Sequence, residues 1–233
     1  MISVMDVLSS NGKPTDKSHD FRLRHPYGML VIGPSQVGKT TWLLKAITSP
    51  DMIQPPHKEI YYFYTEHNKA FEDYPSINFI EGFDPTFISK EFLSGKEDKN
   101  ICLVLDDFQD SPIAKDLLSS LFLRVIHHRG VSCVATLQTA FPRQLNGPEL
   151  SRNCTYKCIF KNASERCETN MVGSKMFPNQ SKYWGEVVDF CHGSNKYIFL
   201  DLHRDCPQHY RVRTGVLPGE EMIIFTPNKL QSR

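Results

Sequence analysis

The sequence has no marked excess of charge of either sign. Its 233 residues include 27 lysines and arginines and 26 aspartates and glutamates, which gives a formal net charge of +1. A protein that coats nucleic acid needs a large excess of basic residues. The charge balance therefore excludes a histone-like or polybasic nucleic-acid coat.

The sequence also lacks a long apolar run and a secretion signal. No apolar run approaches the ~18–20 residues that cross a bilayer. The N-terminal segment MISVMDVLSS has no basic opening, and Asp6 interrupts its apolar residues, so it is a poor signal peptide. We therefore expect a protein that is neither secreted nor bound in a membrane, and that acts inside a cell or inside a virus particle.

Internal repeats and low-complexity segments are absent too, and the remaining composition is that of a globular domain. Hydrophobic residues make up 40% of the chain and charged residues 23%. A chain of this length buries roughly 70–75% of its unfolded surface, which excludes bulk disorder. Polar, turn-forming residues at 9–20 predict a flexible N-terminal arm over residues 1–20. Residues 21–233 are predicted to form one domain, with a core over about 27–161 and a C-terminal extension over about 162–233.

The seven cysteines have no regular spacing, and their number is odd. Two alternatives account for them. Several cysteines and histidines of the second half could in principle bind zinc, but their spacings match no compact two-plus-two pattern. Buried, reduced thiols are the interpretation that we favour. The zinc alternative concerns Cys154, Cys158, Cys167, Cys191, His192, Cys206 and His209, whereas Cys102 and Cys133 fall inside strongly apolar runs.

Apolar runs typical of buried strands alternate with helical patterns, which predicts an α/β fold with a parallel sheet in three α/β/α layers. The helix after the apolar run 101–107 should begin with Ser111 as N-cap and Pro112 in its first turn, and end at about His128, before Gly130. Two later strands look like an added hairpin. The predicted strands are 27–33, 59–65, about 78–82, 101–107, 131–139, 155–161, 196–202 and 209–216. The other predicted helices are 40–47, about 164–176 and about 182–190.

The segment GPSQVGKT, Gly33 to Thr40, is the strongest motif of the chain. It matches G-x-x-x-x-G-K-[ST], follows a predicted strand and opens a predicted helix, which makes a chance match in a turn improbable. Backbone N–H groups of such a loop surround phosphates, Lys39 reaches the β- and γ-phosphates, and the Thr40 hydroxyl binds Mg²⁺. The predicted nucleotide-binding residues are Gly33, Pro34, Ser35, Gln36, Val37, Gly38, Lys39, Thr40 and Thr41.

Two aspartates end the predicted strand ICLVLDD. A carboxylate at the end of a buried strand needs a partner, and in a phosphate-loop protein that partner is magnesium, so Asp106 is the predicted Walker B ligand. Asp107 is placed to act as the general base on the attacking water, a role usually given to glutamate. The alternative is that Asp107 only caps the next turn.

Two further polar residues stand at the borders of predicted strands. Gln138 ends the run VSCVATLQT and is a candidate sensor of the γ-phosphate or the attacking water; otherwise its amide only satisfies a strand terminus. Arg152, in LSRN before the strand 155–161, is from composition alone more simply a solvated surface residue.

Together, GPSQVGKT, ICLVLDDF, VATLQT and LSRNCTYKCIFK resemble the motif series of the FtsK–HerA superfamily, and most closely its viral DNA-packaging ATPases. The resemblance covers Tyr27 to about Lys161. It implies a RecA-like core of the additional-strand, catalytic-acid type, with one more strand between the two Walker motifs, as 59–65 suggests. A GTPase is disfavoured, because the Asn-Lys pairs that begin at Asn68, Asn195 and Asn228 all lack the aspartate of the guanine-binding motif N-K-x-D.

The resemblance also implies roles and partners. It assigns the Walker acids to Asp106 and Asp107, the sensor to Gln138, and an arginine finger acting on the neighbouring subunit to Arg152. Many superfamily members carry Asp-Glu where this chain carries Asp-Asp. An arginine supplied in trans implies a closed homo-oligomeric ring, a pentamer or hexamer. Such rings hydrolyse ATP with Mg²⁺, move double-stranded DNA without sequence preference, and dock to a capsid or portal protein inside the infected host.

Traces of a DNA contact are weak in the sequence itself. Arg143 and the stretch Arg204–Arg213 are candidates, although each is more simply a solvated charge. Two other functions stay open: a nucleotide-dependent switch or assembly ATPase that acts on protein partners, and a small-molecule kinase, which the absence of an arginine-rich lid disfavours.

Overall fold

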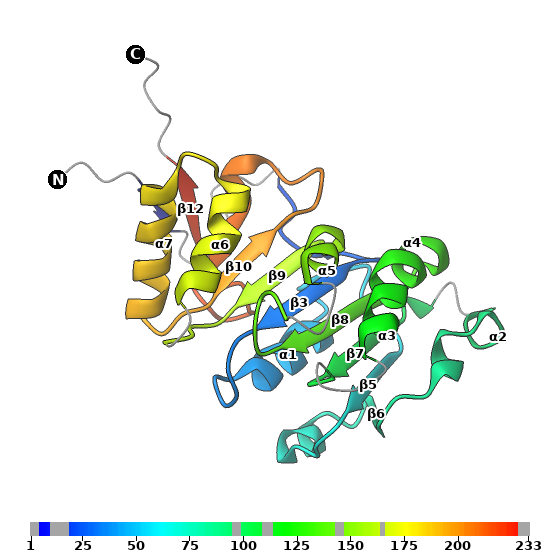
Figure 1. The fold of residues 1–233 in the computed structure, drawn as a ribbon. Helices are drawn as coiled ribbons and strands as arrows, with labels where there is room; N and C mark the ends of the chain where they lie inside the picture. Colours follow the sequence, from blue (N-terminus) through cyan, green and yellow to red (C-terminus); the bar gives the residue numbers. More distant parts are fainter. Residues whose placement is uncertain are drawn as a thin grey trace.

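A mixed β-sheet runs through the whole computed structural model, which describes residues 5–9, 19–94, 99–108, 114–142, 147–163 and 166–227 (Figure 1). Within these residues the sheet has ten strands in the order β1-β12-β11-β10-β9-β3-β8-β7-β5-β6. The strands are β1 (Met5–Ser9), β3 (Gly28–Ile32), β5 (Ile60–Tyr64), β6 (Asn78–Glu81), β7 (Cys102–Asp106), β8 (Ser132–Leu137), β9 (Tyr156–Ile159), β10 (Ile198–Asp201), β11 (Val212–Thr214) and β12 (Ile223–Pro227). A separate parallel pair joins β2 (Leu23–Arg24) and β4 (Ile53–Gln54).

Six neighbouring strands, from β9 to β6, are parallel, which confirms the parallel sheet predicted from the apolar runs. In space the strand between β3 and β7 is β8, with Gly28 opposite Cys133 and Cys102 opposite Ser132. The strand β5, which precedes β7 in the sequence, lies on its far side. The additional strand is therefore present, but it is supplied by the chain after the Asp-Asp pair.

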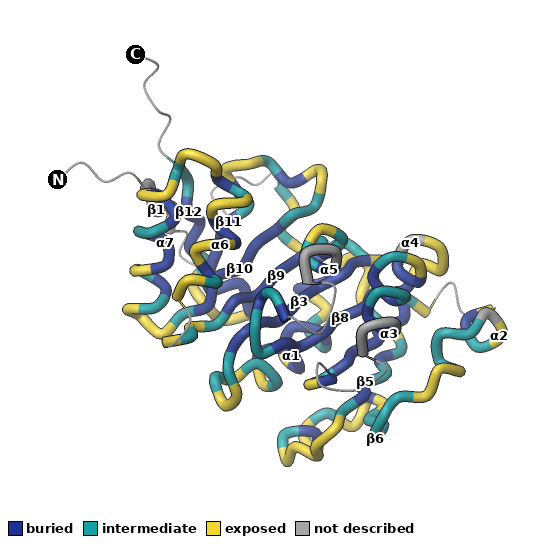
Figure 2. Tube along the Cα trace, in the orientation of Figure 1, coloured by how far each residue is buried: buried dark blue, intermediate teal, exposed yellow. Residues whose placement is uncertain are grey.

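Alternate residues of the central strands point to two apolar layers. Leu30 and Ile32 face the helices α3 (Ala114–Ser120), α4 (Ile126–Arg129), α5 (Gly147–Asn153), α6 (Arg166–Met176) and α7 (Ser181–Gly193). Met29 and Val31 face α1 (Lys39–Thr48) on the other side. The central strands β3, β8 and β9 are buried along their whole length (Figure 2), and the two helical layers complete the predicted α/β/α arrangement.

The predicted helix 111–128 is present in part. Ser111 and Pro112 lie outside the described residues. From Ala114 the chain is helical to Arg129, and Gly130, with φ of 61°, ends it as predicted. The turn Leu121–Val125 within it is a π-helix, which the sequence does not indicate. Within the described residues there are four more short elements: α2 (Lys90–Leu93) and the 3₁₀ turns Lys69–Asp73, Pro85–Ile88 and Gln208–Tyr210.

The C-terminal segment continues the main sheet. The predicted hairpin is present as β10 and β11, and β12 and β1 extend it antiparallel. The predicted flexible arm does not hold for Met5–Ser9, because the open backbone edge of β12 pairs with this segment from Pro227 to Ile223. Within the described residues, no helix is long and apolar enough to span a bilayer.

Two expectations about single residues need correction. Arg213, a candidate for DNA contact, is 1% exposed; its guanidinium pairs with the buried Asp201 at 2.5 Å and lies over the ring of Phe21. A buried arginine with a carboxylate partner is part of the core and cannot reach a duplex. Six cysteines are buried, as expected, but Cys167, in the first turn of α6, is exposed.

Candidate functional site

The loop Gly33–Gly38 connects β3 to α1 at the C-terminal edge of the parallel strands. A β-carbon on Gly33 would lie 2.7 Å from that of Phe160, so only glycine fits beside the end of β9. Gly38 has φ of 94° and begins α1 without a side-chain cap. The first N–H groups of this ten-residue helix therefore point toward the loop without an intrahelical partner, which is the arrangement that binds phosphate.

Lys39 lies inside this loop. Its Nζ donates hydrogen bonds of 2.8 Å to the carbonyl oxygens of Gly33 and Pro34. Burial lowers the pKa of the lysine, and the negative charges of Asp107 and Asp106 act in the opposite direction. An ammonium group held by neutral carbonyls close to two carboxylates can transfer its hydrogen bonds to a phosphate.

Asp106 ends β7 and accepts hydrogen bonds from three hydroxyl groups. Thr136 donates to Oδ1 at 2.6 Å, Tyr62 donates to Oδ2 at 2.7 Å, and Thr40 lies 3.4 Å from Oδ2. Thr40 belongs to the first turn of α1, so the contact joins the start of that helix to the end of β7. Hydroxyl and carboxylate oxygens are the ligands that Mg²⁺ prefers, and the ion keeps several waters besides. The residues present therefore fit a magnesium ion.

Asp107, which follows Asp106, has different contacts. Its φ of 62° is in the left-handed region, which aspartate tolerates better than most residues, and its side chain is exposed. Its N–H donates to Thr136 Oγ1 at 2.9 Å, so one threonine hydroxyl fixes both aspartates. The carboxylate accepts a hydrogen bond from Gln138 Nε2 at 3.2 Å.

Five of the predicted site residues thus meet at one edge of the sheet: Lys39, Thr40, Asp106, Asp107 and Gln138. The structure does not bring Arg152 to them. Arg152 lies exposed in the last turn of α5, before β9 begins at Tyr156, whereas Gly33 follows the end of β3. The strand between these levels is four residues long, about 13 Å. Arg152 is therefore at the opposite edge from the phosphate loop of its own chain, and Arg143 lies outside the described residues.

Sequence reasoning missed Tyr62 and Thr136, which both contact Asp106. Thr136 is visible as a polar residue inside the apolar run VSCVATLQT, two residues before Gln138. Tyr62 carries no comparable signal, because tyrosine is common in strands and only the parallel pairing of β5 with β7 places it beside Asp106.

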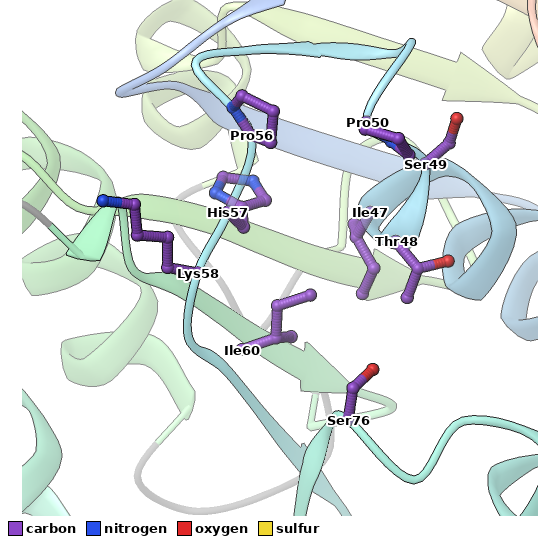
Figure 3. A pocket seen from close by; sticks show the side chains of 9 residues that line it. All are labelled: Ile47, Thr48, Ser49, Pro50, Pro56, His57, Lys58, Ile60 and Ser76. Atoms are coloured by element: carbon purple, nitrogen blue, oxygen red, sulfur yellow. The ribbon is translucent and has the colours of Figure 1, made fainter.

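A separate cavity of about 260 Å³ lies at the other end of α1 (Figure 3). Its walls include Ile47 and Thr48 from the end of that helix, and His57 and Ile60 from the entry to β5. It is not the nucleotide site, because the ten-residue helix, about 15 Å long, separates it from the phosphate loop.

The sequence matches no protein-family model and no curated protein. Among solved structures, the genome packaging NTPase B204 of Sulfolobus turreted icosahedral virus 2, in complex with ATP-gammaS, is similar at a TM-score of 0.50 and 13% identity, over 81% of this chain and 96% of that one. The KaiC-like protein PH0186 of Pyrococcus horikoshii OT3 has a TM-score of 0.48 and 13% identity, over 87% and 90% of the two chains. The cytoplasmic domain of EssC has a TM-score of 0.42 and 18% identity, over 55% and 29%.

The similarity to the packaging NTPase is one of fold. It agrees with the topology and the phosphate loop described above, and the chain therefore has the three-layer α/β/α fold of P-loop ATPases, as the motifs predicted.

Proposed function

We propose that the protein is a Mg²⁺-dependent ATPase of the FtsK–HerA type, which forms a ring and moves double-stranded DNA into a capsid. The observation that carries the proposal is the meeting of Lys39, Thr40, Asp106, Asp107 and Gln138 at one edge of the sheet, with β8 between β3 and β7. This edge offers donors for phosphates, oxygen ligands for a metal and an exposed carboxylate for water.

In this proposal the loop N–H groups and Lys39 bind the β- and γ-phosphates of ATP. Thr40 and Asp106 hold magnesium, which neutralises phosphate charge when it is bound. Tyr62 and Thr136 keep the Asp106 carboxylate turned toward Thr40.

Asp107 accepts the proton of the attacking water. Its carboxylate uses one oxygen for Gln138, and the exposed side chain leaves the other accessible to water. Gln138 thereby orients the base and touches the same water. The base is one methylene shorter than the usual glutamate, and the left-handed backbone at Asp107 sets the direction in which it points.

Arg152 completes the site of a neighbouring subunit. Its place at the opposite edge of the sheet prevents it from reaching its own nucleotide but suits a head-to-tail ring, in which that edge faces the neighbour's phosphate loop. A ring of five or six subunits also multiplies each basic residue around its channel. Arg204, 90% exposed at its side chain, is the described candidate for phosphate contact, and such contacts need no sequence readout.

The proposal is tested by ATP hydrolysis of the purified protein with and without long duplex DNA, together with the mass of the assembly by light scattering. Hydrolysis stimulated by DNA in a pentamer or hexamer supports it, with Lys39→Ala as the variant that no longer binds nucleotide. Hydrolysis indifferent to DNA in a monomer indicates a switch or assembly ATPase, with capsid or portal proteins as possible targets. Absence of hydrolysis in every condition rejects the ATPase itself.

A further inference from the structure

The loop after β8 is held by a carboxylate from the C-terminal part of the chain. Glu168, in the first turn of α6, accepts a hydrogen bond from Thr139 Oγ1 on one oxygen and from the Ala140 N–H on the other, both at 2.9 Å. The Thr139 hydroxyl also accepts from the Phe141 N–H at 3.1 Å. These three residues directly follow Gln138, so the carboxylate fixes the loop next to the residue that contacts Asp107.

The loop has a second attachment to the same helix. Lys175 lies in the last turn of α6, at the opposite end from Glu168. Its Nζ is 4.2 Å from the ring centre of Phe141. Glu168 itself lies where the positive end of the helix dipole stabilises a negative charge. Both ends of α6 therefore contact the loop.

The helix that carries Glu168 is itself firmly packed. A β-carbon on Gly173 would lie 2.2 Å from the Trp184 ring, so α6 and α7 approach as closely as glycine permits. Trp184 Nε1 also donates to the Thr169 carbonyl at 2.9 Å. From α7 the buried Tyr183 hydroxyl donates to the Phe225 carbonyl of β12 at 2.9 Å. The position of Glu168 is thus fixed from the antiparallel end of the sheet.

We propose that Glu168 is a positioning residue for hydrolysis: by holding Thr139 and Ala140 it keeps Gln138 against Asp107. The inference rests on the proposed function, because it gives Glu168 of α6 a role in the hydrolysis at that same site. Both carboxylate oxygens of Glu168 accept hydrogen bonds from the residues that follow Gln138, so its effect passes through Gln138. Substrate binding, which depends on the loop Gly33–Gly38, does not involve it.

The test compares Glu168→Ala and Glu168→Gln with the wild-type protein. Loss of a charged acceptor that holds two donors should lower kcat about tenfold in Glu168→Ala and leave KM for ATP within about twofold. Glu168→Gln keeps an oxygen for the Ala140 N–H and offers its amide to the Thr139 hydroxyl, so it should lose less than about threefold. Glu186→Ala removes a half-buried acid of α7 and none of the loop contacts described above, so it is the matched control and should leave kcat unchanged.

A double variant separates positioning from general loss of structure. If Glu168 acts through Gln138, Glu168→Ala combined with Gln138→Ala is no slower than Gln138→Ala alone. Effects that multiply, or a rise in KM equal to the fall in kcat, overturn the inference.

Hydrogen exchange of the Ala140 and Phe141 amides supplies a readout that needs no turnover. Faster exchange in Glu168→Ala but not in Glu186→Ala is expected, and unchanged exchange overturns the inference. If the wild type does not hydrolyse ATP and exchange still responds, the loop attachment stands and the proposed function fails. If the wild type is active and neither kcat nor exchange responds, the proposed function stands and the role of Glu168 fails.

Discussion

The two edges of the parallel sheet differ in how their polar groups are used. At the C-terminal edge, Lys39, Asp106 and Asp107 are half-buried or exposed, and charged side chains lie close together. At the N-terminal edge, His25, His57, Tyr27 and Ser132 form hydrogen bonds between uncharged groups of the protein. There His25 Nδ1 lies 2.6 Å from Ser132 Oγ, and His57 bridges the Tyr27 hydroxyl at 3.0 Å and the Asn100 carbonyl at 2.9 Å.

The difference indicates which edge can exchange hydrogen-bond partners within the protein for a bound ligand. At the N-terminal edge the hydrogen bonds of His25 and His57 join the segments that precede β3, β5 and β7 to one another and to β8, and so help to hold these strands in register. At the C-terminal edge, by contrast, a phosphate or a metal ion can take the place of a present hydrogen-bond partner. The bonds from Lys39 to the loop carbonyls are an example. Arg152, exposed at the N-terminal edge, is the exception to this division, and it is the residue for which we propose a role outside its own subunit.

The largest effect on hydrolysis is expected from Arg152, the one residue of the N-terminal edge to which we assign a catalytic role. Substitution Arg152→Ala should lower kcat by about a thousandfold, because an arginine finger stabilises the charge on the transferred phosphate. Binding of ATP to the substituted subunit should be unchanged, since its own loop is intact. The measurement is steady-state hydrolysis together with nucleotide affinity.

Mixing decides whether Arg152 acts in trans. Subunits with Arg152→Ala and subunits with Asp107→Asn, each inactive alone, should regain activity when they assemble together. No recovery in mixed assemblies of verified composition contradicts the trans role and leaves Arg152 as a surface residue.

The next effect lies wholly at the C-terminal edge. Asp107→Asn removes the proton acceptor and should lower kcat by about a hundredfold or more, while ATP affinity and oligomer mass stay at wild-type values. Single-turnover hydrolysis and equilibrium binding measure the two quantities. Asp73→Asn, an exposed acid in the turn Lys69–Asp73, is the control; a normal rate in Asp107→Asn would reduce Asp107 to an acceptor for Gln138.

Much of this edge could be predicted, because the relevant signals are local. The phosphate loop and the end of a buried strand are read from a few adjacent residues, and parallel strands bring their C-terminal ends together. Tyr62 and Glu168 could not be predicted, since each reaches the site through pairing or packing with a distant segment. The strand β1 was missed for the same reason, because its partner β12 lies at the far end of the sequence. Arg213 was misjudged because an arginine with a buried aspartate partner looks in the sequence like any surface arginine.

Acid should lower the free energy of unfolding through the buried histidines of the N-terminal edge. Burial lowers the pKa of His57 to about 4, and burial also lowers the pKa of His25. Above pH ~6.5 both folded and unfolded His57 are neutral. Below it the unfolded chain takes up a proton that the folded chain refuses, so stability falls toward pH ~4. At pH ~5 the loss from His57 is about 2 kcal/mol.

The measurement is the free energy of unfolding in urea at pH ~7 and ~5. His57→Gln can still donate to Asn100 and accept from Tyr27, and it should lose about 2 kcal/mol less than wild type over this interval. His128→Gln, on the exposed side of α4, is the control and should follow the wild type. If His57→Gln and the wild type lose the same unfolding free energy, His57 is protonated in the folded protein as easily as in the unfolded chain. The contrast drawn between the two edges would then be wrong.

The smallest expected effect refines the C-terminal edge at Tyr62. The tyrosine is buried under α1, with its ring beside Phe71 and Phe79, and only its hydroxyl reaches Asp106. Tyr62→Phe keeps the packing and removes one of three donors that orient the carboxylate. Since groups behind a metal ligand commonly change metal affinity by tenfold or more, and Thr136 and Thr40 remain, we expect the Mg²⁺ concentration for half-maximal hydrolysis to rise about threefold to tenfold. Tyr61→Phe removes a hydroxyl that donates to Glu59 instead, and should leave the Mg²⁺ requirement unchanged. If Tyr62→Phe needs no more Mg²⁺ than wild type, Thr136 and Thr40 orient Asp106 alone, and the buried strand β5 contributes packing but no polar group to the site.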